Sequence, residues 1–122
     1  MKKIILVEDD PFLIDIYGTK LKESGFELEI ISNGSEVISK VKEIKPDIVI
    51  LDIVLPQMDG WEILKCLRAE ESLKYLKIII LSNLGQREEV DKGIALGATG
   101  YLIKAHFTPS EVVEEIKKHL NQ

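Results

Sequence analysis

The stretch DIVILDIVLPQMDG, residues 47–60, places a strongly apolar run directly before a carboxylate, Asp52, and a turn. Continuous β-branched and aliphatic residues of this kind are typical of a parallel strand that is covered on both faces. The turn contains proline, aspartate and glycine, which favour a loop. We therefore predict a buried strand over residues 47–53 and a loop over residues 56–60.

The same pairing of a strand with a helix recurs along the chain. Apolar runs predict strands over residues 3–7, 26–32, 47–53, 76–81 and 100–103. Helical periodicity follows each of them. Alternating strands and helices indicate right-handed crossovers, a parallel sheet and helices on both of its faces. The predicted fold class is a doubly wound α/β domain that occupies residues 1–122 as one unit, without an attached output domain.

Residues suited to helix ends mark the predicted helices. Pro11 suits the first turn of the first helix, which stops at Gly25, and the later helices have candidate N-caps at Asn33 or Ser35, at Asp59 and at Thr108. The fourth helix has the weakest apolar face. Val90 and Ile94 make that face, and the helix ends at Gly97.

Composition narrows the classes of function. The net charge of −5 and the pI of about 5.1 argue against a surface that neutralises nucleic-acid phosphates. Cys66 is the single cysteine and suits a reducing compartment. The N-terminus becomes charged too early for a signal peptide, and no stretch approaches the roughly 18–20 apolar residues of a membrane helix. We expect a cytoplasmic protein with no membrane and no direct nucleic-acid partner.

Polar side chains lie where four of the predicted strands end: Glu8 and Asp9 at the first, Asp52 at the third, Ser82 at the fourth and Lys104 at the fifth. In open α/β sheets, ligands bind at this carboxyl edge. Clustered carboxylates repel one another unless a cation lies between them, and their oxygens favour Mg²⁺. The ammonium and the hydroxyl could bind a phosphoryl group, and an aspartate can itself attack phosphorus.

Each residue also has a plainer interpretation. The acids after the first strand could cap the next helix, Ser82 could simply end a strand, and Lys104 could be a solvated lysine. Asp52 is harder to explain in this way, because a carboxylate at the end of so apolar a run is costly without a partner. The joint placement of these residues favours a functional site.

Four segments, IILVEDDP (4–11), PDIVILDIVLPQMDGWEIL (46–64), IIILSN (78–83) and GATGYLIKA (97–105), resemble the receiver domain of two-component response regulators in order and spacing. The resemblance covers essentially the whole chain. It implies a flavodoxin-like sheet of five parallel strands in the order 2-1-3-4-5 with five helices.

The resemblance also implies the metal site. Asp9 and Asp52 would bind Mg²⁺ together with the backbone carbonyl of Val54, with Mn²⁺ as a substitute ion, while Glu8 would hold a metal-bound water. Asp10 lies outside the pair of acids that the family has after its first strand, which are Glu8 and Asp9 in this chain. We interpret Asp10 as an acid at the start of a helix.

Asp52 would accept a phosphoryl group from a sensor histidine kinase or a phosphotransfer protein, and Ser82 and Lys104 would each bind one of its oxygens. Tyr101 matches the aromatic switch residue, whose ring moves inward as Ser82 moves toward the phosphate. The face around the fourth helix, fifth strand and fifth helix would then regulate a separate partner, and homodimers could form on phosphorylation. Such a chain is a signalling phosphoacceptor and not an enzyme, apart from its own phosphorylation and dephosphorylation.

Three positions depart from the family pattern or bear on the rate of dephosphorylation. The family usually has proline after the lysine, in a cis bond, whereas this chain has Ala105. Because a non-prolyl cis bond costs about 2.5–4 kcal/mol, we predict a trans Lys104–Ala105 bond. Val54 and Leu84 offer no polar side chain to orient an attacking water, so we predict slow self-dephosphorylation.

Three alternatives remain open. A phosphatase with an aspartate nucleophile fits the spacing of Glu8 and Asp10, but the leading residue is glutamate and no cap insertion is present. A nucleotide or flavin module shares the fold, yet the acids after the first strand would repel a pyrophosphate. A degenerate receiver that only contacts proteins is compatible with Ala105.

Overall fold

The computed structural model describes residues 1–56 and 58–121. Position 57 of the predicted 56–60 loop and the last residue of the chain lie outside that part. Five parallel strands form one sheet in the order β2-β1-β3-β4-β5, as predicted. The strands are β1 (Lys3–Val7), β2 (Glu27–Ile31), β3 (Ile48–Leu51), β4 (Lys77–Ser82) and β5 (Gly100–Ile103). The central strands β1, β3 and β4 are almost completely buried, which explains their continuous apolar sequences.

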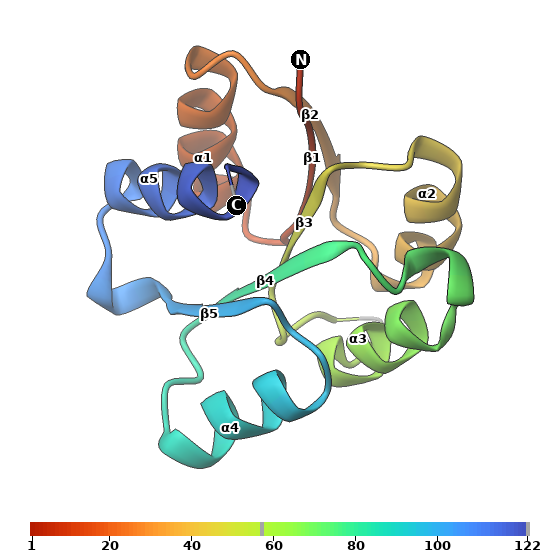
Figure 1. Ribbon diagram of the computed structural model, residues 1–122. Coiled ribbons are helices and arrows are strands. Elements are labelled where there is room, and N and C mark those ends of the chain that lie inside the picture. The colour runs from red at the N-terminus through yellow and green to blue at the C-terminus, as the bar shows by residue number, and fades with distance from the viewer. Residues whose placement is uncertain (57, 122) are drawn as a thin grey trace.

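Helices cover both faces of the sheet (Figure 1). They are α1 (Pro11–Glu23), α2 (Val37–Ile44), α3 (Gly60–Ala69), α4 (Arg87–Ala95) and α5 (Pro109–Leu120). One apolar core joins the sheet to α1 and α5, and a second joins it to α2 and α3. The doubly wound fold class is therefore confirmed.

Side chains cap the helices largely as predicted. The Asp10 carboxylate accepts hydrogen bonds from the backbone N–H groups of Phe12 (2.9 Å) and Leu13 (3.4 Å), so its role at the start of a helix is confirmed. Asp59 accepts from the backbone of Trp61 at 3.0 Å and caps α3. Thr108 caps α5 in a reciprocal pair with Glu111.

The start of α2 is more complex than a single cap. Asn33 accepts a hydrogen bond from the backbone of Ser35 at 3.0 Å and caps a short 3-10 turn, Gly34–Glu36. The α-helix begins only at Val37, without a side-chain cap. Asn33 rather than Ser35 is thus the capping residue, and it stabilises the turn that leads into the helix.

The predicted apolar face of α4 is wrong in one residue. Ile94 is 49% exposed, whereas Gly93 is the buried residue of this helix. A Cβ at Gly93 would lie 2.7 Å from Cδ1 of Ile80 and 2.9 Å from the Tyr101 ring. The helix therefore meets the sheet through a glycine, which lets α4 approach closely and turns Ile94 toward solvent.

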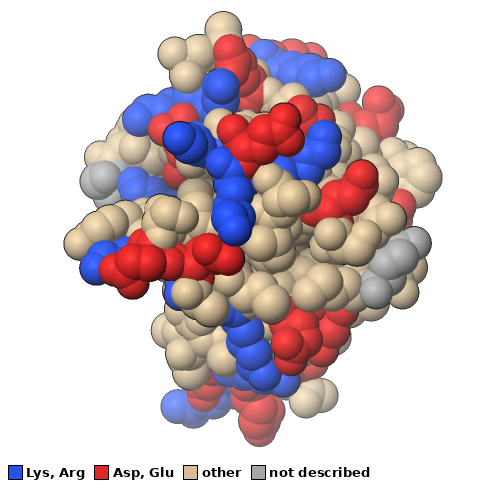
Figure 2. All heavy atoms as spheres, turned by 90° about the vertical axis from the view of Figure 1, so that its right-hand side faces the viewer, with Lys and Arg blue, Asp and Glu red and all other residues tan. Residues whose placement is uncertain are grey.

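The surface carries both signs of charge. On the face that includes α2 and α3, acidic and basic side chains are interspersed around uncharged ones (Figure 2). Within residues 1–56 and 58–121, none of the helices has the length and apolar character needed to cross a membrane. Cys66 is a free, partly buried thiol.

Candidate functional site

Backbone pairing brings the carboxyl ends of β1 and β3 together. Val7 pairs with Leu51, so the residues that follow them, Glu8 and Asp52, leave the sheet side by side. The backbone N–H of Asp52 donates to the Val7 carbonyl (3.1 Å), and that of Glu8 donates to the Ile31 carbonyl (3.1 Å). These two bonds extend the ladders by one residue and hold both carboxylates at the sheet edge.

Three carboxylates gather at this edge. Glu8, Asp9 and Asp52 each place an oxygen within 4.8 Å of the others. Glu8 and Asp52 are 1% and 6% exposed, whereas Asp9 faces solvent. Burial raises the pKa of Glu8, and the charge of Asp52 raises it further, against the opposing effect of Lys104. The cluster therefore opens to water through Asp9 and holds its other two carboxylates in a poorly solvated place.

Lys104, the residue that directly follows β5, supplies the opposite charge. Its Nζ atom lies 2.8 Å from Oδ2 of Asp52 and 2.8 Å from Oε2 of Glu8. Burial lowers the pKa of Lys104, but its hydrogen bonds with the two carboxylates outweigh burial and leave this pKa above its ordinary value. The direct ion pair with Glu8 was not predicted, because the sequence does not show which of several acids a lysine will reach.

The Lys104–Ala105 bond is trans, since no peptide bond in the described part of the chain is cis. The prediction is confirmed. Lys104 begins a short 3-10 turn, Lys104–His106, and reaches both carboxylates from there. The proline of the family is therefore not required to bring this ammonium to the acidic edge.

Ser82 and Tyr101 are linked through the backbone of Leu84. Ser82 is completely buried at the end of β4, and its Oγ accepts a hydrogen bond from the Leu84 N–H at 3.2 Å. The Tyr101 hydroxyl donates to the Leu84 carbonyl at 2.5 Å. Burial, followed by the charges of Glu89 and Asp52, raises the pKa of Tyr101 to about 12. The Tyr101 ring thus lies inward against α4 in the unmodified protein, an arrangement that we had expected only after phosphorylation.

Val54 lies beside the acidic cluster. Its backbone N–H donates to Oδ1 of Asp52 at 3.3 Å, and its side chain is 61% exposed. With Leu84 and Trp61 it lines a hollow next to Asp52. Its carbonyl remains a predicted metal ligand.

Tyr17 was missed by the sequence analysis. It lies on the apolar face of α1 and is 4% exposed among core residues. Burial raises the pKa of its phenol, and the charges of Lys104, Glu8 and Asp52 also act on it. A tyrosine at apolar helical spacing gives no signal that distinguishes its hydroxyl end from its ring.

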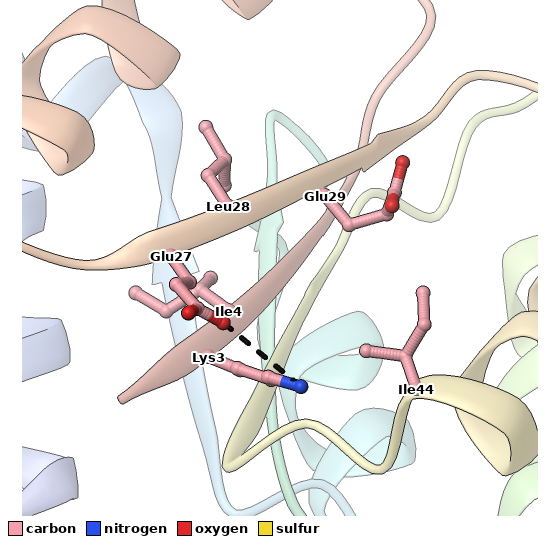
Figure 3. Close-up of a pocket in the computed structure, with 6 residues that line it drawn as sticks. All are labelled: Lys3, Ile4, Glu27, Leu28, Glu29 and Ile44. Carbon is pink, nitrogen blue, oxygen red and sulfur yellow. Dashed lines mark ion pairs between the residues drawn. The ribbon is translucent and has the colours of Figure 1, made fainter. Parts of the chain in front are cut away.

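A separate hollow lies at the other end of the sheet (Figure 3). It is lined by Lys3, Ile4, Glu27, Leu28, Glu29 and Ile44, and Lys3 and Glu27 form an ion pair at 3.9 Å across it. Both side chains of the pair are about half exposed, so its contribution to stability is small. Because Lys3 begins β1 whereas Glu8 follows its last residue, this hollow is remote from the acidic edge.

The acidic edge suits a hard divalent cation and a phosphoryl group. When all four groups are charged, the three carboxylates and one ammonium leave a net charge of about −2. The donors are carboxylate oxygens, which Mg²⁺ prefers, and Asp9 leaves the cluster open to solvent. The residues present therefore fit a magnesium site.

Known proteins resemble this chain in sequence and in fold. The sequence profile of the response regulator receiver domain matches residues 4–117. The chain belongs to the response regulator receiver family. Chemotaxis protein CheY of Thermotoga maritima is 36% identical over 96% of both chains. The BeF3-activated receiver domain of Klebsiella pneumoniae RstA, 28% identical, superposes with a TM-score of 0.89 over 98% of this chain and 99% of that one.

Many relatives of this receiver are longer proteins. DNA-binding response regulator MtrA of Mycolicibacterium smegmatis is 32% identical over 99% of this chain but only 51% of its own length. The chain thus spans about half the length of the first curated relatives that it matches. Receiver domains are signalling proteins that undergo phosphorylation and dephosphorylation, so the family match favours this class over a phosphatase or a nucleotide-binding module.

Proposed function

We propose that this receiver accepts a phosphoryl group on Asp52 from a phosphohistidine of a sensor histidine kinase or a phosphotransfer protein. The observation that carries the proposal is the environment of the Asp52 carboxylate. It ends a buried strand, lies among the carboxylates of Glu8 and Asp9, and has the Lys104 ammonium 2.8 Å from Oδ2. A carboxylate held next to cationic groups can act as a nucleophile toward phosphorus.

In the proposed transfer, a carboxylate oxygen of Asp52 forms a bond to phosphorus while the phosphorus–nitrogen bond of the donor breaks. The electron pair of that bond stays on the imidazole, which takes up a proton from solvent. Lys104 offsets the negative charge of the phosphoryl oxygens, and the buried Ser82 hydroxyl donates to one of them after reorienting. Asp52 leaves the reaction as an acyl phosphate.

Magnesium has a defined place in this proposal. Asp9 and Asp52 would hold the ion with the Val54 carbonyl, Glu8 would bind it through water, and Mn²⁺ would substitute. The bound cation would neutralise charge on the phosphoryl oxygens during transfer. Binding requires an ionised Glu8, whose raised pKa makes the affinity for Mg²⁺ fall as the pH decreases.

The proposed output is a change in the face formed by α4, β5 and α5. Phosphorylation adds about 1.5–2 negative charges to Asp52, and Ser82 responds to them. Because Ser82 contacts Leu84, and Leu84 contacts Tyr101, the change passes from the site to β5. We propose that this face regulates a separate protein in the cytoplasm, without direct contact with DNA or membrane. The same face is available for a homodimer once Asp52 is phosphorylated.

Intact mass spectrometry tests the acceptor. Wild type, Asp52→Asn and the control Asp59→Asn are incubated with Mg²⁺ and acetyl phosphate, and separately with a phosphorylated histidine phosphotransfer domain. The control keeps the cap of α3, because asparagine caps helices as well as aspartate does. We expect a Mg²⁺-dependent, phosphate-sized gain in wild type and Asp59→Asn only. A gain that persists in Asp52→Asn contradicts the acceptor, and no gain from either donor contradicts the function and supports a degenerate receiver.

A further inference from the structure

Helix α4 is held at one end and connected to the phosphoryl site at the other. After its last turn, the Gly97 carbonyl accepts a hydrogen bond from Nε of Arg68 at 2.8 Å, and Nη1 of Arg68 donates to the Leu73 carbonyl at 3.1 Å. The partly buried Arg68 side chain therefore fastens the C-terminal end of α4 to the end of α3. The N-terminal end of α4 follows the loop in which Leu84 contacts Ser82.

Between these ends, a contact between two side chains joins α4 to α3. Nζ of Lys92 lies 4.7 Å from the centre of the Trp61 ring. Tryptophan gives the strongest cation–π attraction of the aromatic side chains. Trp61 is partly buried at the start of α3 and shares the hollow beside Asp52 with Val54 and Leu84. The contact thus joins α4 to a side chain that lines the same hollow as Val54, whose backbone N–H bonds to Asp52.

Other contacts depend on the same position of α4. The Tyr101 ring fits inward only because Gly93 leaves room for it, with the missing Cβ position 2.9 Å from a ring carbon. Its hydroxyl bonds to Leu84 in the loop that leads into α4. Because Arg68 holds the other end, displacement of α4 from α3 would swing this loop and open the Tyr101 contacts together.

We propose that the Trp61–Lys92 contact is a latch that holds α4 against α3 and stabilises the inward arrangement of Tyr101 before any phosphorylation. The latch operates in the unmodified chain, and its use in signalling rests on the proposed function. Exposed cation–π pairs correspond to about a two- to fivefold shift in a two-state equilibrium. Loss of the latch should therefore increase local opening of α4 by about this factor.

Hydrogen exchange in the unmodified protein tests the latch. The amide of Val90 in α4 donates to the carbonyl of the N-cap residue Gln86, the amide of the C-cap residue Leu96 donates to the carbonyl of Lys92, and both report opening of the helix. We expect Lys92→Met to accelerate exchange across this helix by about two- to fivefold, and Lys92→Arg to exchange like wild type. Lys118→Met, which removes an ammonium from the last turn of α5, is the matched control and should leave α4 unchanged.

A double-mutant cycle separates the latch from the effect of the lysine on helix α4 itself. In Trp61→Leu, the further change Lys92→Met should have little effect, because the aromatic partner is already absent. Equal acceleration by Lys92→Met in the wild-type and Trp61→Leu backgrounds would overturn the proposal, as would wild-type exchange in Lys92→Met. Trp61→Phe provides a milder second variant if Trp61→Leu does not fold.

The same tryptophan allows failure of the latch to be distinguished from failure of the proposed function. Trp61 is the single tryptophan, so tryptophan emission reports the surroundings of this side chain, and the comparison with Lys92→Met isolates the part that depends on the contact. Beryllium fluoride with Mg²⁺ serves as a phosphoryl analogue, and we expect it to change Trp61 emission in wild type and to have a smaller effect in Lys92→Met. If the analogue has no effect while the exchange results hold, the latch stands and the signalling role fails. If exchange is insensitive to Lys92, the latch fails whatever the analogue does.

Discussion

The substitution Gly93→Ala sets the higher helix propensity of alanine against the close contact of α4 with the sheet. A glycine in a helix destabilises it by about 0.8–1.0 kcal/mol relative to alanine, so Gly→Ala normally stabilises. At Gly93, however, the new Cβ would lie 2.7 Å from Cδ1 of Ile80 and 2.9 Å from Cδ2 of Tyr101. Both distances are shorter than ordinary carbon contacts, so the ring or the helix must move.

Gly18 in α1 provides the matched comparison. A Cβ there would lie 3.5 Å from Cδ2 of Leu28 and 3.7 Å from Cδ1 of Ile30, which are ordinary contacts. Gly18→Ala should therefore increase the free energy of unfolding by about 1 kcal/mol. Overpacking costs about 1–3 kcal/mol, so Gly93→Ala should be less stable than Gly18→Ala by about that amount.

Urea unfolding of both variants measures this difference, and phenolate absorbance reports where the Tyr101 ring goes. Because burial is the main cause of the raised Tyr101 pKa, displacement of the ring toward solvent should lower that pKa from about 12. Subtraction of the Tyr101→Phe titration isolates this phenol. Equal stability of the two alanine variants, with the Tyr101 pKa still at about 12, would refute the close approach of α4 to the sheet.

Three further outcomes follow from the site. Ser82→Ala leaves the Leu84 N–H without its acceptor, so we expect the free energy of unfolding in urea to fall by about 1 kcal/mol. The change in Trp61 emission on adding beryllium fluoride should also be smaller, whereas phosphorylation itself should be less affected. Ser110→Ala, on an exposed residue, is the control. Val54→Asn should accelerate loss of phosphate from Asp52, measured by intact mass over time, because asparagine can orient a water that valine cannot, and an unchanged rate would contradict slow self-dephosphorylation at this site. The Tyr101 pKa is raised in the folded state, so the phenol stabilises the fold fully below about pH 10 and less as the pH rises toward 12. The difference in free energy of unfolding between wild type and Tyr101→Phe should therefore narrow over that range. A constant difference would contradict the raised pKa.

The strands and the acidic edge could be predicted because each is determined by residues that are neighbours in the sequence. Buried parallel strands require continuous apolar runs, and a carboxylate directly after such a run must leave the sheet at its carboxyl edge. Glu8 and Asp52 were placed correctly for this reason. The order of the strands was implied by the family resemblance, since apolar runs alone do not state which strands are neighbours.

The errors have a common physical origin. Apolar periodicity locates the buried face of a helix by its large residues, and α4 meets the sheet through Gly93, which has no side chain to give that signal. The bonds of Leu84 with Ser82 and Tyr101 use its backbone N–H and carbonyl, which every residue type except proline offers. The contact of Trp61 with Lys92 depends on the spacing of two helices, which neither local sequence specifies.

The position of the Lys104 ammonium depends on its ion pairs with two carboxylates as much as on the path of the backbone. With a trans bond to Ala105, its ammonium still lies 2.8 Å from both Glu8 and Asp52. Phosphorylation would increase the negative charge on the Asp52 side by about 1.5–2, and the shared ammonium would shift toward it. Glu8, whose pKa is already raised by burial, would then lose part of the positive charge that offsets its own. A divalent cation at the acidic edge would supply positive charge beside Glu8 in place of the ammonium. Occupancy of the metal site and stability of the acyl phosphate should therefore be coupled through Glu8.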